Sequence, residues 1–111
     1  MAFDEELGER VRALLADEHG LTERKMFGGL SFMLEGHMCC GIVGDELMLR
    51  LGIDGAEDAL EHDHVRPMDF TGRAMAGMVF VSVEGLRGTA LRRWVQRAAA
   101  FVRTLPPKHR G

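Results

Sequence analysis

The sequence has few cysteines and no long apolar run, and each absence excludes a class of protein. Its 111 residues include two cysteines, which are the adjacent Cys39 and Cys40. Adjacent side chains in a strand point to opposite faces, so we expect no disulfide framework and predict a reduced, cytoplasmic protein. No stretch approaches the roughly 20 apolar residues of a transmembrane helix. The chain begins with acidic residues at Asp4, Glu5 and Glu6, whereas a secretory signal needs a basic start.

Acidic residues are also absent from the last part of the chain, residues 85–111. All 17 acidic residues precede this region, and seven basic residues lie within it: Arg87, Arg92, Arg93, Arg97, Arg103, Lys108 and Arg110. A basic end on an acidic body can attract an anionic partner. However, most of these arginines belong to one predicted helix, where they face solvent or favour the helix dipole. Because the net charge is −3, we expect at most weak, nonspecific binding of nucleic acid.

The residues that are present are typical of one globular domain, which we place at residues 1–111. Hydrophobic residues make up 46% of the chain and charged residues 28%, within the ordinary range for such domains. Periodicity predicts a helix over 3–18, a short helix capped by Asp54, with Glu57 in capping-box position, and a final helix over 88–105. Strands are predicted at 24–34, 38–43, 46–51, 68–70 and 77–83.

Short turns join most of these strands, so neighbouring strands must be antiparallel. The two long helices each carry a single apolar stripe, which places both on one face of the sheet. The predicted fold is therefore an α+β two-layer sandwich with a five-stranded antiparallel sheet and the order α-β-β-β-α-β-β-α. Asp4 is the predicted N-cap of the first helix, Gly20 is expected to end its pattern, and Trp94 is expected to be largely buried in the final helix.

The other face of the predicted sheet is rich in methionine. Met33 and Met48 are expected there, together with some of Phe27, Met38 and Met78. An exposed apolar face of this kind favours self-association or a protein partner. We therefore predict a homodimer. The alternatives are that the face binds a partner protein or that the C-terminal tail folds back to cover it.

Two short segments contain residues that bind metals in other proteins. His37-Met38-Cys39-Cys40 offers soft ligands, but zinc sites normally use spaced cysteine pairs. His62-Asp63-His64 is more typical of a solvated loop. We therefore predict no metal site at either segment.

The pair Gly28-Gly29 interrupts the first predicted strand. Such a pair indicates a bulge or a close approach of backbone. With Arg24 and Lys25 beside it, the pair could also present amides and positive charge to an anion. Other residues near strand ends extend this candidate surface site: Arg50, Arg66, Asp69 and Arg73, among which an ion pair of Asp69 with an arginine is the simpler interpretation. The sequence shows no activated nucleophile or phosphate loop, so we predict no catalytic residue and no cofactor.

Six segments in order resemble the TfoX/Sxy N-terminal domain family. They are Arg24-Lys25-Met26-Phe27-Gly28-Gly29, Gly36-His37-Met38, Leu47-Met48-Leu49-Arg50, Arg66-Pro67-Met68, Gly77-Met78-Val79-Phe80-Val81 and Trp94-Val95 through Leu105-Pro106. The resemblance implies a fold similar to type III secretion chaperones. The family takes its name from bacterial regulators of natural competence, which act with the transcription machinery and have a helical C-terminal domain. We expect this chain to be a stand-alone N-terminal domain.

The resemblance identifies a module without supplying a reaction. Some stand-alone relatives carry an RNA-methyltransferase label, but the sequence lacks the glycine-rich strand-to-helix loop of a nucleotide-binding fold. We predict a regulatory or accessory interaction module of the bacterial cytoplasm rather than an enzyme. The alternatives are a weak nucleic-acid-associated protein and an RNA-modifying enzyme with unidentified residues.

Overall fold

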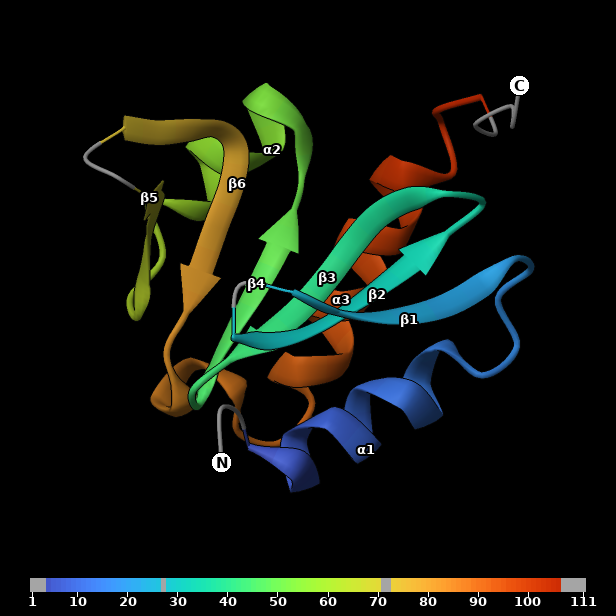
Figure 1. Cartoon of the computed structure of the whole chain (residues 1–111). Helices are drawn as coiled ribbons and strands as arrows, with labels where there is room; N and C mark the ends of the chain where they lie inside the picture. Colours follow the sequence, from blue (N-terminus) through green and yellow to red (C-terminus); the bar gives the residue numbers. More distant parts are fainter. Residues whose placement is uncertain (1–3, 27, 71–72, 107–111) are drawn as a thin grey trace.

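The structure is a computed structural model that describes residues 4–26, 28–70 and 73–106 (Figure 1). The helices in this part of the chain are α1 (Glu5–Leu15), α2 (Gly52–Ala59) and α3 (Ala90–Val102), with a short 3₁₀ helix η1 (Val83–Leu86) before α3. The strands are β1 (Leu21–Met26), β2 (Gly29–Leu34), β3 (His37–Val43), β4 (Glu46–Arg50), β5 (Val65–Phe70) and β6 (Arg73–Val81). The predicted α+β class is confirmed.

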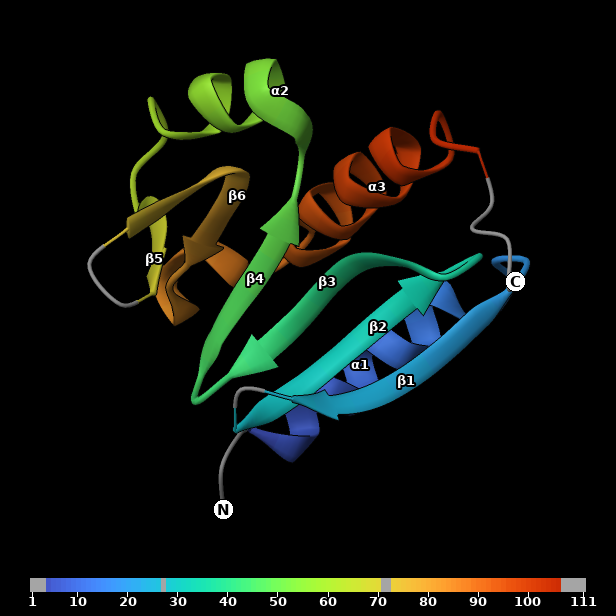
Figure 2. The same cartoon turned by 45° about the horizontal axis from the view of Figure 1, so that its top comes forward.

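The strands form one antiparallel sheet in the order β1-β2-β3-β4-β6-β5. Figure 2 shows this order from β1 to β5 and the strong twist between the two edges. The sheet has six strands, so the prediction of five was wrong. The predicted strand over 24–34 is a hairpin of β1 and β2, in which Met26 pairs with Gly29.

The glycine pair lies at the end of this hairpin, with Gly28 in the turn and Gly29 as the first residue of β2, and it does not form a bulge. Gly28 has a φ of +73°, a left-handed conformation that glycine adopts without a steric penalty. Gly29 shows the close approach that the sequence also suggested, because a Cβ there would collide with the Ile42 carbonyl oxygen. The bulge lies elsewhere, on β3, where Cys39 is the extra residue opposite Phe32 and Met33 of β2. Phe27 lies outside the described residues.

Local signals explain where two of the helices begin. The Asp4 carboxylate accepts a hydrogen bond from the Leu7 amide at 3.1 Å, which confirms Asp4 as the N-cap of α1. The predicted cap of α2 at Asp54 was wrong, because this helix begins at Gly52 and Leu51 occupies the N-cap without a side-chain bond. Gly52 has a φ of +79°, which lets the chain turn from β4 directly into α2.

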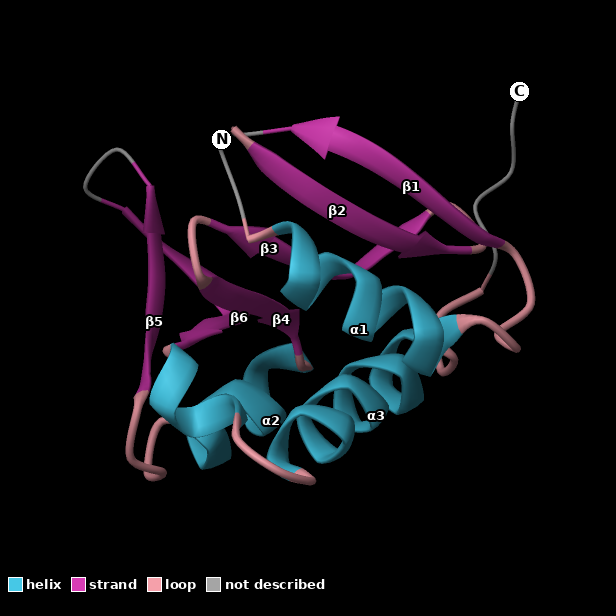
Figure 3. Cartoon of the chain, turned by 90° about the horizontal axis from the view of Figure 1, so that it is seen from below, coloured by secondary structure: helices cyan, strands magenta, loops and turns pink. Residues whose placement is uncertain are grey.

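The main core lies between the sheet and the helices. Figure 3 shows α1, α2 and α3 together on one side of the sheet, which confirms the prediction that the two long helices share a face. Their buried side chains pack on those of the strands: Leu7, Val11 and Leu15 of α1, Leu91, Trp94, Val95, Ala98 and Val102 of α3, and Phe32, Ile42, Leu47, Leu49, Val79 and Val81 of the sheet. Trp94 is 8% exposed, so its predicted burial is confirmed.

The opposite face of the sheet carries a second, smaller apolar cluster. Met48, Met68, Met78 and Phe80 form it and are each at most 7% exposed. Met48 therefore lies on the predicted face but is buried within the chain. The exposed methionine face on which the homodimer prediction depended is largely covered in the structure, and the homodimer loses that support.

The two cysteines lie in the same core, contrary to the prediction that they point to opposite faces. Phe32 pairs with Cys40 and Met33 with Met38, so Cys39 is the extra residue of a β-bulge. A bulge breaks the regular alternation of side chains along a strand. Both thiols are consequently buried in the helix-side core, and neither forms a disulfide.

Candidate functional site

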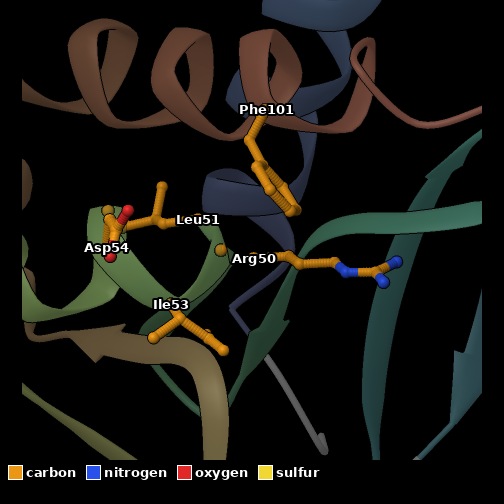
Figure 4. A pocket seen from close by; sticks show the side chains of 8 residues that line it. Arg50, Leu51, Ile53, Asp54 and Phe101 are labelled. Atoms are coloured by element: carbon orange, nitrogen blue, oxygen red, sulfur yellow. The ribbon is translucent and has the colours of Figure 1, made fainter.

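A pocket of about 670 Å³ opens where β4 runs into α2 (Figure 4). Four parts of the chain contribute to it: the end of β4, the first turn of α2, β6 and α3. The residues that line it are Arg50, Leu51, Gly52, Ile53, Asp54, Gly55, Gly77 and Phe101. Residues far apart in sequence thus form one concave surface, which is the usual geometry of a binding site.

Two glycines hold the floor of the pocket. The Leu51 amide donates a hydrogen bond to the Gly77 carbonyl at 2.8 Å, which joins the start of α2 to β6. Gly77 has a φ of +81°, and a Cβ there would lie 3.2 Å from the Gly52 carbonyl carbon. A Cβ on Gly52 would lie 2.5 Å from the Phe101 ring. Glycine is therefore required at both positions for the backbone and the ring to approach this closely.

The side chains around these glycines change from basic to apolar to acidic along the pocket. Phe101 reaches down from α3 toward the β4–α2 junction, and Arg50 extends to one side of it (Figure 4). The Arg50 guanidinium carbon lies 6.0 Å from the centre of the Phe101 ring. Ile53 stands at the rim with 64% of its surface exposed. Asp54 lies on the other side, so an apolar middle separates a cation from a carboxylate.

Arg50 and Asp54 are the two ionisable side chains in the lining. Elsewhere in the molecule, local contacts shift the pKa values of other groups. A hydrogen bond with Cys39, together with burial, raises the pKa of the Cys40 thiol well above its usual range. A hydrogen bond from Arg12 lowers the pKa of Glu23 at the surface.

The predicted surface residues are not all brought to one place. Arg24 and Lys25 are exposed on the edge strand β1, beside the Gly28-Gly29 turn. Arg66 is on β5, the opposite edge of the sheet. Its guanidinium donates to both carboxylate oxygens of Glu46, at 2.5 and 3.2 Å, and lies 4.5 Å from the centre of the Phe80 ring.

Of the predicted residues, Arg50 is the one that lines the pocket. Asp69 and Arg73 belong to the β5–β6 hairpin, where Asp69 pairs with Ala74 and Arg73 with Phe70. Their side chains lie outside what the structure describes. The Asp69 ion pair therefore stays a prediction.

Sequence reasoning missed Ile53 and Phe101 as site residues. Phe101 follows the apolar stripe of α3 and was assigned to the core, but its ring is only half-buried and lies over Gly52. Ile53 is the residue after Gly52, at the point where the strand pattern stops. A large apolar residue between a strand and a predicted helix cap, outside both patterns, was the available signal for it.

The two segments with metal-binding residue types differ in burial. Cys39 and Cys40 are fully buried, while His62 and His64 are exposed. The His62 ring packs edge-on against Trp94, with ring centres 5.4 Å apart. Within residues 4–26, 28–70 and 73–106, no group of three His, Cys, Asp or Glu side chains is placed to hold a metal ion.

Among the described residues, none of the helices is long and apolar enough to cross a bilayer.

Comparison with known proteins places the chain in a family. Searches of curated proteins and of solved structures gave no match, so the likeness to type III secretion chaperones stays a prediction. The family model for the TfoX N-terminal domain matches residues 13–102. This match spans most of the chain, from the last turn of α1 to the end of α3, and the protein therefore belongs to the TfoX N-terminal domain family.

Proposed function

We propose that this domain is a regulatory or accessory interaction module, of the kind that competence regulators carry, and that it binds a partner protein through the pocket at the β4–α2 junction. The observation that carries the proposal is the exposed Ile53 at the rim of an open pocket with an apolar middle. Burying an exposed isoleucine in an interface is favourable by roughly 1.5–3 kcal/mol. Apolar side chains clustered around a concavity commonly mark a site of protein binding.

The charges of the last helix support a protein partner over a nucleic acid. Arg97 of α3 donates to Asp58 of α2 at 3.0 Å, and Arg103 donates to Glu18 at 2.5 Å. Two basic residues of the acid-free region are thus already paired with carboxylates of the same chain. Fewer free cations remain to contact phosphates, so nucleic-acid binding is expected to be weak and nonspecific.

Site-specific photo-crosslinking in the native host tests the proposal. A photoreactive phenylalanine analogue at position 53 should form a discrete adduct with one partner protein, which mass spectrometry then identifies. The matched control places the same analogue at Val83, which is 43% exposed on η1 and outside the pocket lining. Adding Arg50→Glu to the position 53 variant should reduce the adduct. Equal adducts from positions 53 and 83, or no adduct at 53, would contradict the proposal.

A further inference from the structure

We infer that the pocket binds an extended segment of the partner that presents an apolar side chain and, two residues away, a carboxylate. The apolar side chain would lie between Ile53 and Phe101, and the carboxylate would pair with Arg50. This inference rests on the proposed function and specifies the partner chemistry of the same pocket.

Arg50 is a cation that lacks a carboxylate partner in the described part of the chain. Four other arginines there are paired with carboxylates: Arg12 with Glu23, Arg66 with Glu46, Arg97 with Asp58 and Arg103 with Glu18. The remaining arginines whose side chains the structure describes are exposed. The contact recorded for the Arg50 guanidinium is instead the face of Phe101. Arg50 is also half-buried, so water screens its charge less than that of a fully exposed arginine. A carboxylate from a partner complements this charge.

The spacing of the two contacts fits an extended chain. The Arg50 guanidinium carbon is 6.0 Å from the centre of the Phe101 ring. Residues i and i+2 of an extended segment point to the same side and are about 7 Å apart. An apolar residue at i and an acidic residue at i+2 can therefore contact Phe101 and Arg50 together.

The charges of α2 set the direction of the segment and select against a polyanion. Asp54 and Glu57 are exposed on α2, and Glu61 follows the helix. A row of phosphates running from Arg50 past Ile53 would meet Asp54 in the pocket lining at the start of an acidic helix, and like charges repel. A single carboxylate at the Arg50 end avoids them. The pocket thus favours a peptide with one acidic residue over a nucleic-acid strand.

The floor of the pocket is formed before any partner arrives. The hydrogen bond from Leu51 to Gly77 and the contact of Phe101 with Gly52 fix the backbone and one wall. A preformed site loses little conformational freedom on binding, and this makes weak binding by a short peptide measurable.

The test is an NMR titration of the ¹⁵N-labelled full chain with two peptides. The probe is acetyl-Ala-Leu-Ala-Glu-Ala-amide, and the comparison peptide has Gln in place of Glu. The amide signals of Gly52, Ile53 and Gly77 should shift with the Glu peptide, with a dissociation constant of about 1 mM. The Gln peptide should bind about threefold more weakly, as expected for a partly exposed ion pair.

Two variants assign this preference to the pocket. Arg50→Gln should remove the preference for Glu over Gln while its spectrum stays that of a folded domain. The matched control is Arg24→Gln, since Arg24 is an exposed arginine on β1 outside the pocket lining, and it should keep the preference.

Three results would overturn the inference. They are equal binding of the two peptides, a Glu preference that survives Arg50→Gln, and shifts of the same pocket signals by a single-stranded oligonucleotide that the Glu peptide does not displace. If any of these occurs while the photo-crosslink at position 53 persists, the proposed function stands and only the chemistry assigned to the partner falls. Loss of the crosslink as well would contradict both.

Discussion

The two faces of the sheet have different compositions and are buried in different ways. The face toward α1, α2 and α3 carries branched aliphatic residues, Phe32 and both cysteines, and the helices cover it. The other face carries Met48, Met68, Met78 and Phe80, and no helix among the described residues packs on it. These side chains are nevertheless almost fully buried. A sheet face without a helix can therefore still bury its own core.

The pairing register explains how the open face is covered. One row of directly paired residues crosses all six strands: Arg24, Ser31, Gly41, Met48, Phe80 and Arg66. Gly41 has no side chain, and a Cβ there would lie 2.9 Å from the terminal methyl of Met48. Met48 therefore fills the space above Gly41. At the β5 edge, Arg66 covers the Phe80 ring and pairs with Glu46, so a charged side chain shields the apolar row from solvent.

The largest expected effect is on the helix-covered face. Replacing Trp94 with Ala should lower the free energy of unfolding by roughly 3–5 kcal/mol, because a large buried ring is lost and a cavity remains. Trp94 also contacts His62 and lies 4.8 Å from the guanidinium carbon of Arg97. Urea unfolding measures the change. Val83→Ala, at an exposed position, serves as the control. If Trp94→Ala is as stable as Val83→Ala, Trp94 does not belong to the core.

The next effect tests whether the open face is a genuine core. Met48→Ala should lower the free energy of unfolding by about 2–3 kcal/mol, because the Met48 side chain is only 1% exposed. Met33→Ala is the matched control, since Met33 lies on the same face but is only half-buried. If both variants lose less than about 0.5 kcal/mol, as surface substitutions do, the methionine cluster does not stabilise the fold and the two faces differ more than we infer.

Much of the helix-covered face could be predicted from the sequence, because local signals determine it. The apolar stripes placed α1 and α3 on one face, and the Asp4 cap was identified correctly. At Gly28-Gly29 the same residues permit either a bulge or a turn, and only the register of β1 against β2 decides between them. Alternation along β4 gave the correct face for Met48, but the side chains that bury it come from other strands.

The candidate site could be predicted only in part. Arg50 was identified from its place at a strand end. The pocket itself depends on contacts between residues distant in sequence, since Gly77 bonds to the amide before Gly52 and Phe101 arrives from α3. Nothing in the local sequence indicates which glycine approaches which ring. Long-range packing forms the site, so no local sequence motif indicates it.

A smaller effect concerns the buried thiol on the helix-covered face. Folding raises the pKa of Cys40, so the folded state keeps a proton that the unfolded chain releases above its usual pKa of about 8.5. Stability is therefore complete below that pH and falls as the pH rises above it, by up to about 1.4 kcal/mol per pH unit for one thiol. Urea midpoints at pH 7.5 and 9.5, with reductant present, should separate more for the wild type than for Cys40→Ala. Equal separations would exclude Cys40 as the source.

The smallest effect compares two neighbours on β1 that point to opposite faces. Glu23 is paired with Phe32 across the sheet and accepts hydrogen bonds from Arg12 of α1 at 2.5 and 2.8 Å. Arg24 is paired with Ser31 on the open face and has no carboxylate partner in the described residues. The pKa of Glu23 is lowered by Arg12. The ion pair therefore contributes stability above the usual carboxyl pKa of about 4.3, and this contribution is lost as the pH falls through the lowered value. At pH 7, Glu23→Gln should lower Tm by about 1–2 °C while Arg24→Gln leaves it unchanged, since exposed ion pairs contribute little. At pH 3 or below the difference between the two variants should shrink toward zero, and a difference that persists there would mean that packing rather than charge distinguishes the two positions.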